Sequence, residues 1–232
     1  MIGIIGAMQI EVDNICALIV NKKIDKISGI DFVSGQIENR DVVVAKCGVG
    51  KVFAAICAQT MCLEFSPSLI INVGVGGSLS ENLGIGDIAI ASAAVQHDMD
   101  TTPLGEPKGF LSGIDIVEIP SDSDTVKSIE EIATALNIHH ETGLIASGDQ
   151  FIGSVSQKRS ITADFCAIAC EMEGAAIAQT AYLNRVPFCI IRAISDDADG
   201  NAAESFPSFA VSAAENSARL VTEFVKKRGD IL

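Results

Sequence analysis

The sequence predicts an α/β fold in which a central mixed, largely parallel sheet is flanked by helices in three layers. Short apolar segments bounded by glycine or polar residues alternate with longer segments whose apolar residues recur at helical spacing. Hydrophobic residues make up 48% of the chain and the mean hydropathy is +0.38, as expected when strands are buried on both faces. No linker or internal repeat divides the 232 residues, so we expect one domain spanning residues 1–232.

The first half of the chain begins with a short buried strand at residues 2–6. A helix is expected from Ala7, ending near Lys22 and Lys23, whose positive charges suit the end of a helix. Its predicted apolar face comprises Ile10, Ile15, Leu18 and Ile19. The elements expected next are a strand meander over 24–47 with a turn at 38–40, a helix over 51–65, and a strand over 69–73 that enters the glycine-rich loop GVGGSLSENLGIGD.

The second half continues the alternation of strands and helices. The expected strands cover residues 88–96, 115–119, 142–147, 166–172 and 188–194. The expected helices cover residues 121–136, capped by Ser121 or Ser123, then 157–162, 173–184 and 208–227. Residues 98–113 form a long irregular segment, which inside a compact domain is usually functional or mobile.

Composition excludes several classes of partner. The formal net charge of −14 would repel nucleic acids and anionic membrane surfaces. No apolar run is long enough to cross a bilayer, and the N-terminal residues lack the basic region of a signal peptide. The seven cysteines are odd in number and contain no CxxC pair, so we expect a reducing, cytoplasmic location. Cys166 and Cys170 are interpreted as core residues rather than metal ligands.

Carboxylates recur just after predicted buried strands. Glu11 follows the first strand, Glu173 follows the segment AIACEM, and Asp196 follows a strand that also contains Arg192. Alternation along a strand would place Glu171 and Glu173 on the same face. If the strands are parallel, their carboxyl ends meet at one edge and the acids share a cleft. Alternatively, each acid separately caps a helix or lies in a loop.

Two glycine-rich segments do not match phosphate-binding motifs. Gly74, Gly76 and Gly77 lack a third glycine at GxGxxG spacing, so a dinucleotide site is not expected. Gly50 and Lys51 resemble the end of a P-loop, but a valine stands where serine or threonine is required. Glycines at positions 74–77 instead allow a ligand to approach the backbone closely. The three histidines, at positions 97, 139 and 140, are weak signals individually.

Taken in order, the segments GIIGAMQIEV, GVGGSL, SGDQFI, ACEMEGAAIA and RAISDDAD resemble those of the bacterial 5′-methylthioadenosine/S-adenosylhomocysteine nucleosidases. These belong with the purine nucleoside and uridine phosphorylases, and the resemblance extends from Gly3 to the final helix. It implies a nucleoside phosphorylase-like fold and hydrolysis that releases adenine, without a metal or organic cofactor, in methionine salvage. The GAMxxE segment favours a nucleosidase, because a carboxylate at Glu11 repels phosphate but can accept a proton from water.

The resemblance also implies roles for individual residues. Glu11 would be the general base for the attacking water, and Asp196 the general acid at adenine N7. Glu173 would hold the ribose hydroxyls, and Arg192 would orient the water or the carboxylates. The implied substrate-binding residues are Met8 and Met172 at the ribose, Phe151, Ile152 and Gly77 at the base, and Val75, Gly76 and Ser195 beside them.

Relatives of this kind are homodimers in which the partner chain closes the subsite for the 5′ substituent. By position, Val49, Leu104 and Pro107 would form this apolar subsite, with segment 98–113 as the contributing or gating piece. Val75 departs from the serine of many relatives, which removes a hydroxyl contact to the catalytic acid or water.

Three alternative functions stay open at this point. The first is cleavage of 6-amino-6-deoxyfutalosine in menaquinone synthesis, and the second is a purine nucleoside phosphorylase. The third is a catalytically silent nucleoside-binding protein, in which one of the acids would be missing. Glu11, Glu173 and Asp196 are all present, which disfavours the third alternative.

Overall fold

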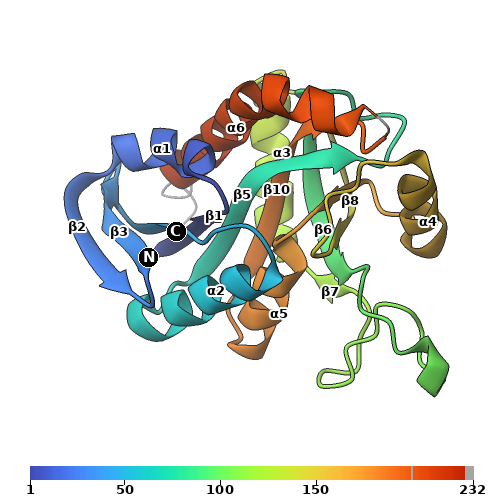
Figure 1. The fold of residues 1–232 in the computed structure, drawn as a ribbon. Coiled ribbons are helices and arrows are strands. Elements are labelled where there is room, and N and C mark those ends of the chain that lie inside the picture. Colours follow the sequence, from blue (N-terminus) through green and yellow to red (C-terminus); the bar gives the residue numbers. More distant parts are fainter. Residues whose placement is uncertain (200, 228–232) are drawn as a thin grey trace.

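A mixed sheet of ten strands forms the centre of the protein (Figure 1), shown here as a computed structural model that describes residues 1–199 and 201–227. Its order is β10-β6-β8-β9-β5-β1-β4-β3-β2, with β7 paired to β6. The strands are β1 (Ile2–Gly6), β2 (Val20–Ile27), β3 (Ile30–Ile37), β4 (Arg40–Lys46), β5 (Leu69–Ser78), β6 (Ile88–Gln96), β7 (Ile119–Pro120), β8 (His140–Ser147), β9 (Ala169–Glu171) and β10 (Phe188–Asp196).

Helices cover the sheet on both faces, as the three-layer prediction requires (Figure 1). Helices α1 (Gln9–Leu18), α3 (Ser123–Ala135) and α6 (Ala202–Lys227) share one apolar layer with the sheet. Helices α2 (Lys51–Phe65) and α5 (Gly174–Leu183) pack on the opposite face. Helix α4 (Val155–Phe165) lies at one end, and a 3₁₀ turn at Thr102–Leu104 interrupts segment 98–113. None of the helices in the described ranges is long and apolar enough to cross a membrane.

Strand β5 pairs with both β9 and β10, so β5, β10, β6, β8 and β9 close into a ring. Strands β4, β1, β5 and β10 run parallel, which brings their carboxyl ends to one edge. Strand β9 is antiparallel to β5, contrary to the simplest parallel arrangement. Its carboxyl end nevertheless reaches this edge, because Cys170 pairs with Gly77. Closure of the ring therefore gathers the ends of β1, β5, β9 and β10.

Several predicted boundaries were wrong for identifiable reasons. Helix α1 ends at Leu18, which is 46% exposed rather than part of the apolar face, and the lysines at 22 and 23 lie in β2. Residues 74–78 continue β5 instead of forming a loop, because they pair with β10 and β9. The cap of α3 is Asp122, whose carboxylate accepts from the Thr125 backbone N–H, and neither candidate serine.

Two further differences concern the second half of the chain. Helix α6 begins at Ala202 and contains Pro207 in its second turn, where proline has no N–H to donate to the carbonyl of residue 203. Strand β9 is limited to Ala169–Glu171, and Cys166 is an exposed residue at the end of α4 rather than a core residue. Glu173 therefore lies beyond the strand, as the N-cap of α5, and the strand alternation predicted for the two glutamates does not apply.

Candidate active site

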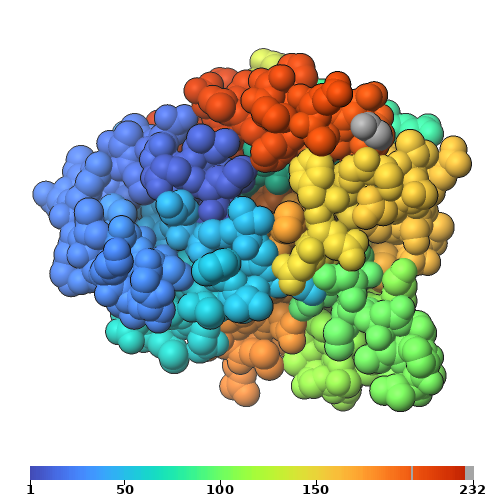
Figure 2. Space-filling view, viewed as in Figure 1, coloured from blue at the N-terminus to red at the C-terminus, as the bar shows by residue number. Residues whose placement is uncertain are grey.

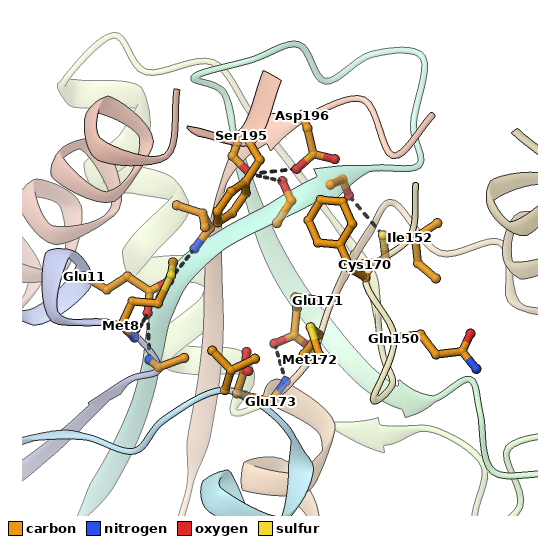
Figure 3. A pocket seen from close by; sticks show the side chains of 17 residues that line it. Met8, Glu11, Gln150, Ile152, Cys170, Glu171, Met172, Glu173, Ser195 and Asp196 are labelled. Carbon is orange, nitrogen blue, oxygen red and sulfur yellow. Dashed lines mark hydrogen bonds between the residues drawn. The ribbon is translucent and has the colours of Figure 1, made fainter. Parts of the chain in front are cut away.

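A cavity of about 280 Å³ opens where the ends of β1, β5, β9 and β10 meet. Figure 2 shows the surface hollowed where the cyan, yellow and red segments of the chain approach one another. The described residues that line the cavity are Ala7, Met8, Glu11, Val49, Val75, Gly76, Gly77, Gln150, Phe151, Ile152, Cys170, Glu171, Met172, Glu173, Ser195, Asp196 and Phe206. Figure 3 shows that its carboxylates approach from different elements of the fold.

Glu11 lies in the first turn of α1 and is buried. Its Oε2 accepts hydrogen bonds from the backbone N–H groups of Ala7 (2.7 Å) and Met8 (2.8 Å), and Oε1 accepts from Val75 N–H (3.1 Å). Burial raises the pKa of Glu11, although Arg192 and these donors oppose the rise. The carboxylate is thus fixed in one orientation and has an increased affinity for a proton, as a general base requires.

Asp196 ends β10 and is also buried. Its Oδ1 accepts from Ala198 N–H (2.9 Å) and its Oδ2 from the Ser195 hydroxyl (2.9 Å). Burial raises the pKa of Asp196 above its ordinary value, with the two hydrogen bonds opposing this effect. A carboxyl group with a raised pKa, held at the cavity wall, is suited to donate a proton.

Glu173 is held at the mouth of the cavity by the backbone that precedes α2. Its Oε1 accepts a hydrogen bond from Gly50 N–H at 2.8 Å. Burial, followed by the neighbouring charge of Glu171, raises the pKa of Glu173 to about 7. This carboxyl group therefore changes its protonation state near neutral pH.

Arg192 forms a buried ion pair with Glu171, which lines the cavity, and also contacts the side chain of Asn72. Glu171 also accepts from the Ser147 hydroxyl and from the backbone N–H groups of Glu173 (3.0 Å) and Gly174 (2.7 Å). Burial would raise the pKa of Glu171, but Arg192 and these donors lower it overall. Arg192 itself does not line the cavity, so of the two roles predicted for it, only orientation of a carboxylate is compatible with this position.

Two glycines of β5 make room for the acids rather than for a ligand alone. A Cβ added at Gly74 would lie 2.6 Å from Oε1 of Glu11. A Cβ added at Gly77 would lie 2.8 Å from Oδ1 of Asp196 and 2.9 Å from Cβ of Ala198. All three distances are shorter than non-bonded contacts allow, so these positions must be glycine for the carboxylates to occupy their places.

The remaining walls are mostly apolar. Met8 and Met172 come from the segments after β1 and β9, while Phe151 and Ile152 come from the segment after β8. Phe151 packs edge-to-face with Phe206 of α6, with ring centroids 5.8 Å apart. This contact was missed from the sequence because the last helix was predicted to begin only at residue 208. Glu171, expected from the sequence as one of two acids on the same strand face, also lines the cavity, whereas Ala7, Gln150, Cys170 and Phe206 were given no site role from the sequence.

Leu104 and Pro107 do not line the cavity of their own chain. Leu104 is 81% exposed at the end of the 3₁₀ turn, and Figure 1 shows segment 98–113 projecting away from the body of the protein. Val49, the third residue predicted for this subsite, does line the cavity. The single chain therefore brings together only part of the predicted subsite.

The charge of the cavity restricts its chemistry. Four carboxylates line it, from Glu11, Glu171, Glu173 and Asp196, and no described lysine, arginine or histidine does. Arg192, whose charge acts on Glu11, Glu171 and Glu173, is itself paired with Glu171. A phosphate dianion would meet net negative charge here, whereas water or a sugar that develops positive charge would not be repelled.

The model of the phosphorylase superfamily matches residues 1–226. A curated 5′-methylthioadenosine/S-adenosylhomocysteine nucleosidase of Staphylococcus haemolyticus is 40% identical over 97% of this chain and 99% of its own length. Among solved structures, the nucleosidase of that name from Neisseria meningitidis, in complex with methylthio-immucillin-A, has a TM-score of 0.94 at 35% identity and covers 97% of this chain and 98% of its own. The futalosine hydrolase of Helicobacter pylori is similar to the same degree, with a TM-score of 0.94, 35% identity, and coverage of 100% and 97%.

The closed sheet has carboxylates where its strand ends meet, and the relatives match almost the whole chain. Together these findings define a nucleoside-cleaving class of protein. The chain belongs to the phosphorylase superfamily and, within it, to the 5′-methylthioadenosine/S-adenosylhomocysteine nucleosidases.

Proposed function

We propose that the protein hydrolyses the N-glycosidic bond of 5′-methylthioadenosine and S-adenosylhomocysteine, releasing adenine. The observation that carries this proposal is a cavity lined by four carboxylates and by no described cationic side chain. Cleavage of this bond develops positive charge on the sugar and negative charge on the base. Carboxylates stabilise the first, and a protonated carboxyl group neutralises the second.

In the proposed mechanism, Glu11 accepts a proton from the attacking water. Three backbone N–H groups fix its carboxylate, so the base is oriented before the substrate arrives. Asp196 donates a proton to N7 of adenine, which makes the base a better leaving group. The raised pKa values of both groups suit proton transfer near neutral pH.

Glu173 would hold the ribose hydroxyls and stabilise the developing sugar cation. Arg192 acts as a positioning residue through Glu171, because its guanidinium reaches that carboxylate and not the cavity. The Glu171 carboxylate in turn accepts from the backbone N–H of Glu173, which fixes the start of α5. Val75 donates its backbone N–H to Glu11, a bond that does not depend on the serine hydroxyl of many relatives.

The apolar walls would bind the rest of the nucleoside. Phe151 would stack on adenine, and the backbone of Ile152 would recognise its edge, with Gly76, Gly77 and Ser195 beside it. Met8 and Met172 would pack on the ribose, and Val49 would contact the 5′ substituent. The substituted nucleoside needs no metal or organic cofactor for this chemistry.

We further propose a homodimer in which Leu104 and Pro107 of the segment 98–113 close the 5′ subsite of the partner. Helix α2, which starts at the cavity mouth, exposes a row of apolar side chains, namely Val52, Phe53, Ile56 and Leu63. Several large apolar side chains exposed on one helix are typical of a protein interface. A mass measurement in solution tests this proposal, and a monomer at micromolar concentration would contradict it.

We propose a cytoplasmic location and a role in methionine salvage, with residues 1–232 forming one domain. All seven cysteines are free, which suits a reducing compartment. The sheet extends from residue 2 to residue 196 and α6 then packs on β5 and β10, which supports a single domain.

The experiment is adenine release from 5′-methylthioadenosine, S-adenosylhomocysteine and 6-amino-6-deoxyfutalosine by the purified protein. We expect the first two substrates to be hydrolysed with the larger kcat/KM. The futalosine hydrolase of Helicobacter pylori, equally similar in fold, supports aminodeoxyfutalosine as the second candidate substrate. A kcat/KM that is highest for aminodeoxyfutalosine would favour that assignment, and failure to cleave any of the three would refute the proposed function.

A further inference from the structure

Lys51, Asp98 and Asp149 form a hydrogen-bonded cluster beside the cavity mouth. The ammonium group of Lys51 lies 2.6 Å from Oδ1 of Asp98, while Oδ2 of Asp98 accepts from Asp149 N–H at 2.9 Å. The Asp149 carboxylate accepts in return from the backbone N–H of Lys51 at 2.8 Å. The three residues come from the start of α2, the end of β6 and the end of β8, so the cluster joins three separate parts of the chain.

This cluster is more enclosed than an ordinary surface ion pair. The side chains of Lys51 and Asp98 are only 18% and 17% exposed. Lys51 also donates to Oε1 of Gln96 (3.1 Å), whose amide donates to Gln179 of α5 (2.6 Å). Burial would raise the pKa of Asp98, but the Lys51 ammonium and the Asp149 N–H lower it overall. Gly50 and Lys51 resemble the end of a P-loop in the sequence, but in the structure the Lys51 ammonium binds Asp98 and Gln96.

The residues adjoining the cluster form the two sides of the cavity mouth. On one side, Val49 lines the cavity and Gly50 N–H donates to Glu173. On the other side, Phe151 and Ile152 line it two and three residues after Asp149. The two sides approach closely, because a Cβ at Gly50, where φ is +101°, would lie 3.1 Å from Oδ1 of Asp149.

We propose that Lys51, Asp98 and Asp149 are positioning residues that hold segments 48–50 and 149–152 in the arrangement that binds the substrate. The inference rests on the proposed function and extends it to residues that do not line the cavity. Loss of the Lys51 ammonium leaves Asp98 without its counter-ion and removes one of the two links between the segments, so that only the bond from the Lys51 backbone N–H to the Asp149 carboxylate still joins them. Substrate binding should then weaken, while the chemical groups at Glu11 and Asp196 stay in place.

The test compares Lys51→Met with Lys51→Arg and with Lys108→Met. Lys108 lies in segment 98–113, as Asp98 does, and forms an ion pair of the same length with Asp164. Its side chain is 36% exposed, however. We expect Lys51→Met to raise KM for 5′-methylthioadenosine and the Kd for adenine about tenfold, the effect of losing a hydrogen bond to a charged group. Its kcat should change less than about threefold, Lys51→Arg should recover most of the affinity, and Lys108→Met should behave as wild type.

Thermal unfolding of each variant separates positioning from stability. A folded Lys51→Met variant with unchanged KM and unchanged adenine Kd would overturn the proposal, as would an equal loss of affinity in Lys108→Met. If Lys51→Met does not fold, the isosteric Asp98→Asn change provides the same comparison. Adenine binding, measured by calorimetry, tests the cluster even if the wild-type protein fails to cleave the nucleoside, so the two proposals can fail separately. Absence of adenine binding to the wild-type protein would overturn both.

Discussion

Replacement of Asp196 by asparagine should remove the general acid while leaving the site intact. In the native protein, Oδ1 of Asp196 accepts from Ala198 N–H and Oδ2 accepts from the Ser195 hydroxyl. An asparagine oxygen can keep the first bond. Its amide can donate to the Ser195 oxygen, because the hydroxyl can then turn to Gly76 O, 3.4 Å away. We therefore expect little change in the free energy of unfolding.

The same substitution should have a large effect on the rate. General acid catalysis contributes about 10² to 10⁴ in rate, so kcat should fall by this factor, or about 3 to 5 kcal/mol in activation free energy. Substrate binding should be largely retained, because the apolar walls and Glu173 are unchanged. The assay is adenine release at substrate saturation, with Kd measured separately. Turnover equal to that of the wild-type protein would refute the role assigned to Asp196.

Three further predictions follow from the contacts of the site. Gly74→Ala should lower kcat about 100-fold, because the new methyl group displaces the Glu11 carboxylate; Gly113→Ala, where the added Cβ meets nothing within 4 Å, is the matched control. Arg192→Met should lower the free energy of unfolding in urea by about 3 to 5 kcal/mol, because Glu171 loses its buried partner, and a loss below about 1 kcal/mol would contradict this account. The pKa of Glu173 is raised to about 7 from an ordinary value of 4.5, so the native state binds this proton more tightly and the free energy of unfolding falls as pH rises between these values. Glu173→Gln should flatten that decline in urea titrations at several pH values, and an unchanged slope would exclude Glu173 as its source.

Elements with clear boundaries in the sequence were predicted to the residue. The strands Ile2–Gly6 and Ile88–Gln96 and the helix Lys51–Phe65 are apolar segments bounded by glycine, proline or charge, and the structure confirms all three ranges. The layered α/β fold follows from the alternation of such segments. Closure of the ring between β5 and β10 could not be predicted this way, because hydrophobic period does not determine which strands pair.

The glycine-rich segment shows why local signals misled the prediction. Gly74, Gly76 and Gly77 are typical of a loop, yet they continue β5 because they pair with β10 and β9, and Glu11 and Asp196 fill the space of the missing side chains at Gly74 and Gly77. The need for glycine at positions 74 and 77 therefore comes from residues distant in the sequence. The prediction of close backbone approach was physically sound, but the approaching groups include the protein's own carboxylates.

The ion pair of Glu171 and Arg192 was missed for a related reason. Strand alternation predicted that Glu171 and Glu173 share a face, but the strand ends at Glu171 and the two side chains have different partners. The position of Leu104 and Pro107 relative to a site could not be predicted from one chain, because the contacts predicted for them are with a partner chain. The three acids expected to converge do line one cavity, because β1 and β10 are parallel neighbours of β5 and β9 pairs with the carboxyl end of β5.

In the proposed reaction, water activated at a carboxylate-lined site is the nucleophile. The most direct measurement follows products from 5′-methylthioadenosine with and without inorganic phosphate, using phosphorus NMR for sugar phosphates and absorbance for adenine. We predict full adenine release in phosphate-free buffer, with free 5-methylthioribose as the sugar product and no phosphate ester when phosphate is present. A strict requirement for phosphate, with formation of a sugar 1-phosphate, would contradict the role of Glu11 and make the protein a phosphorylase.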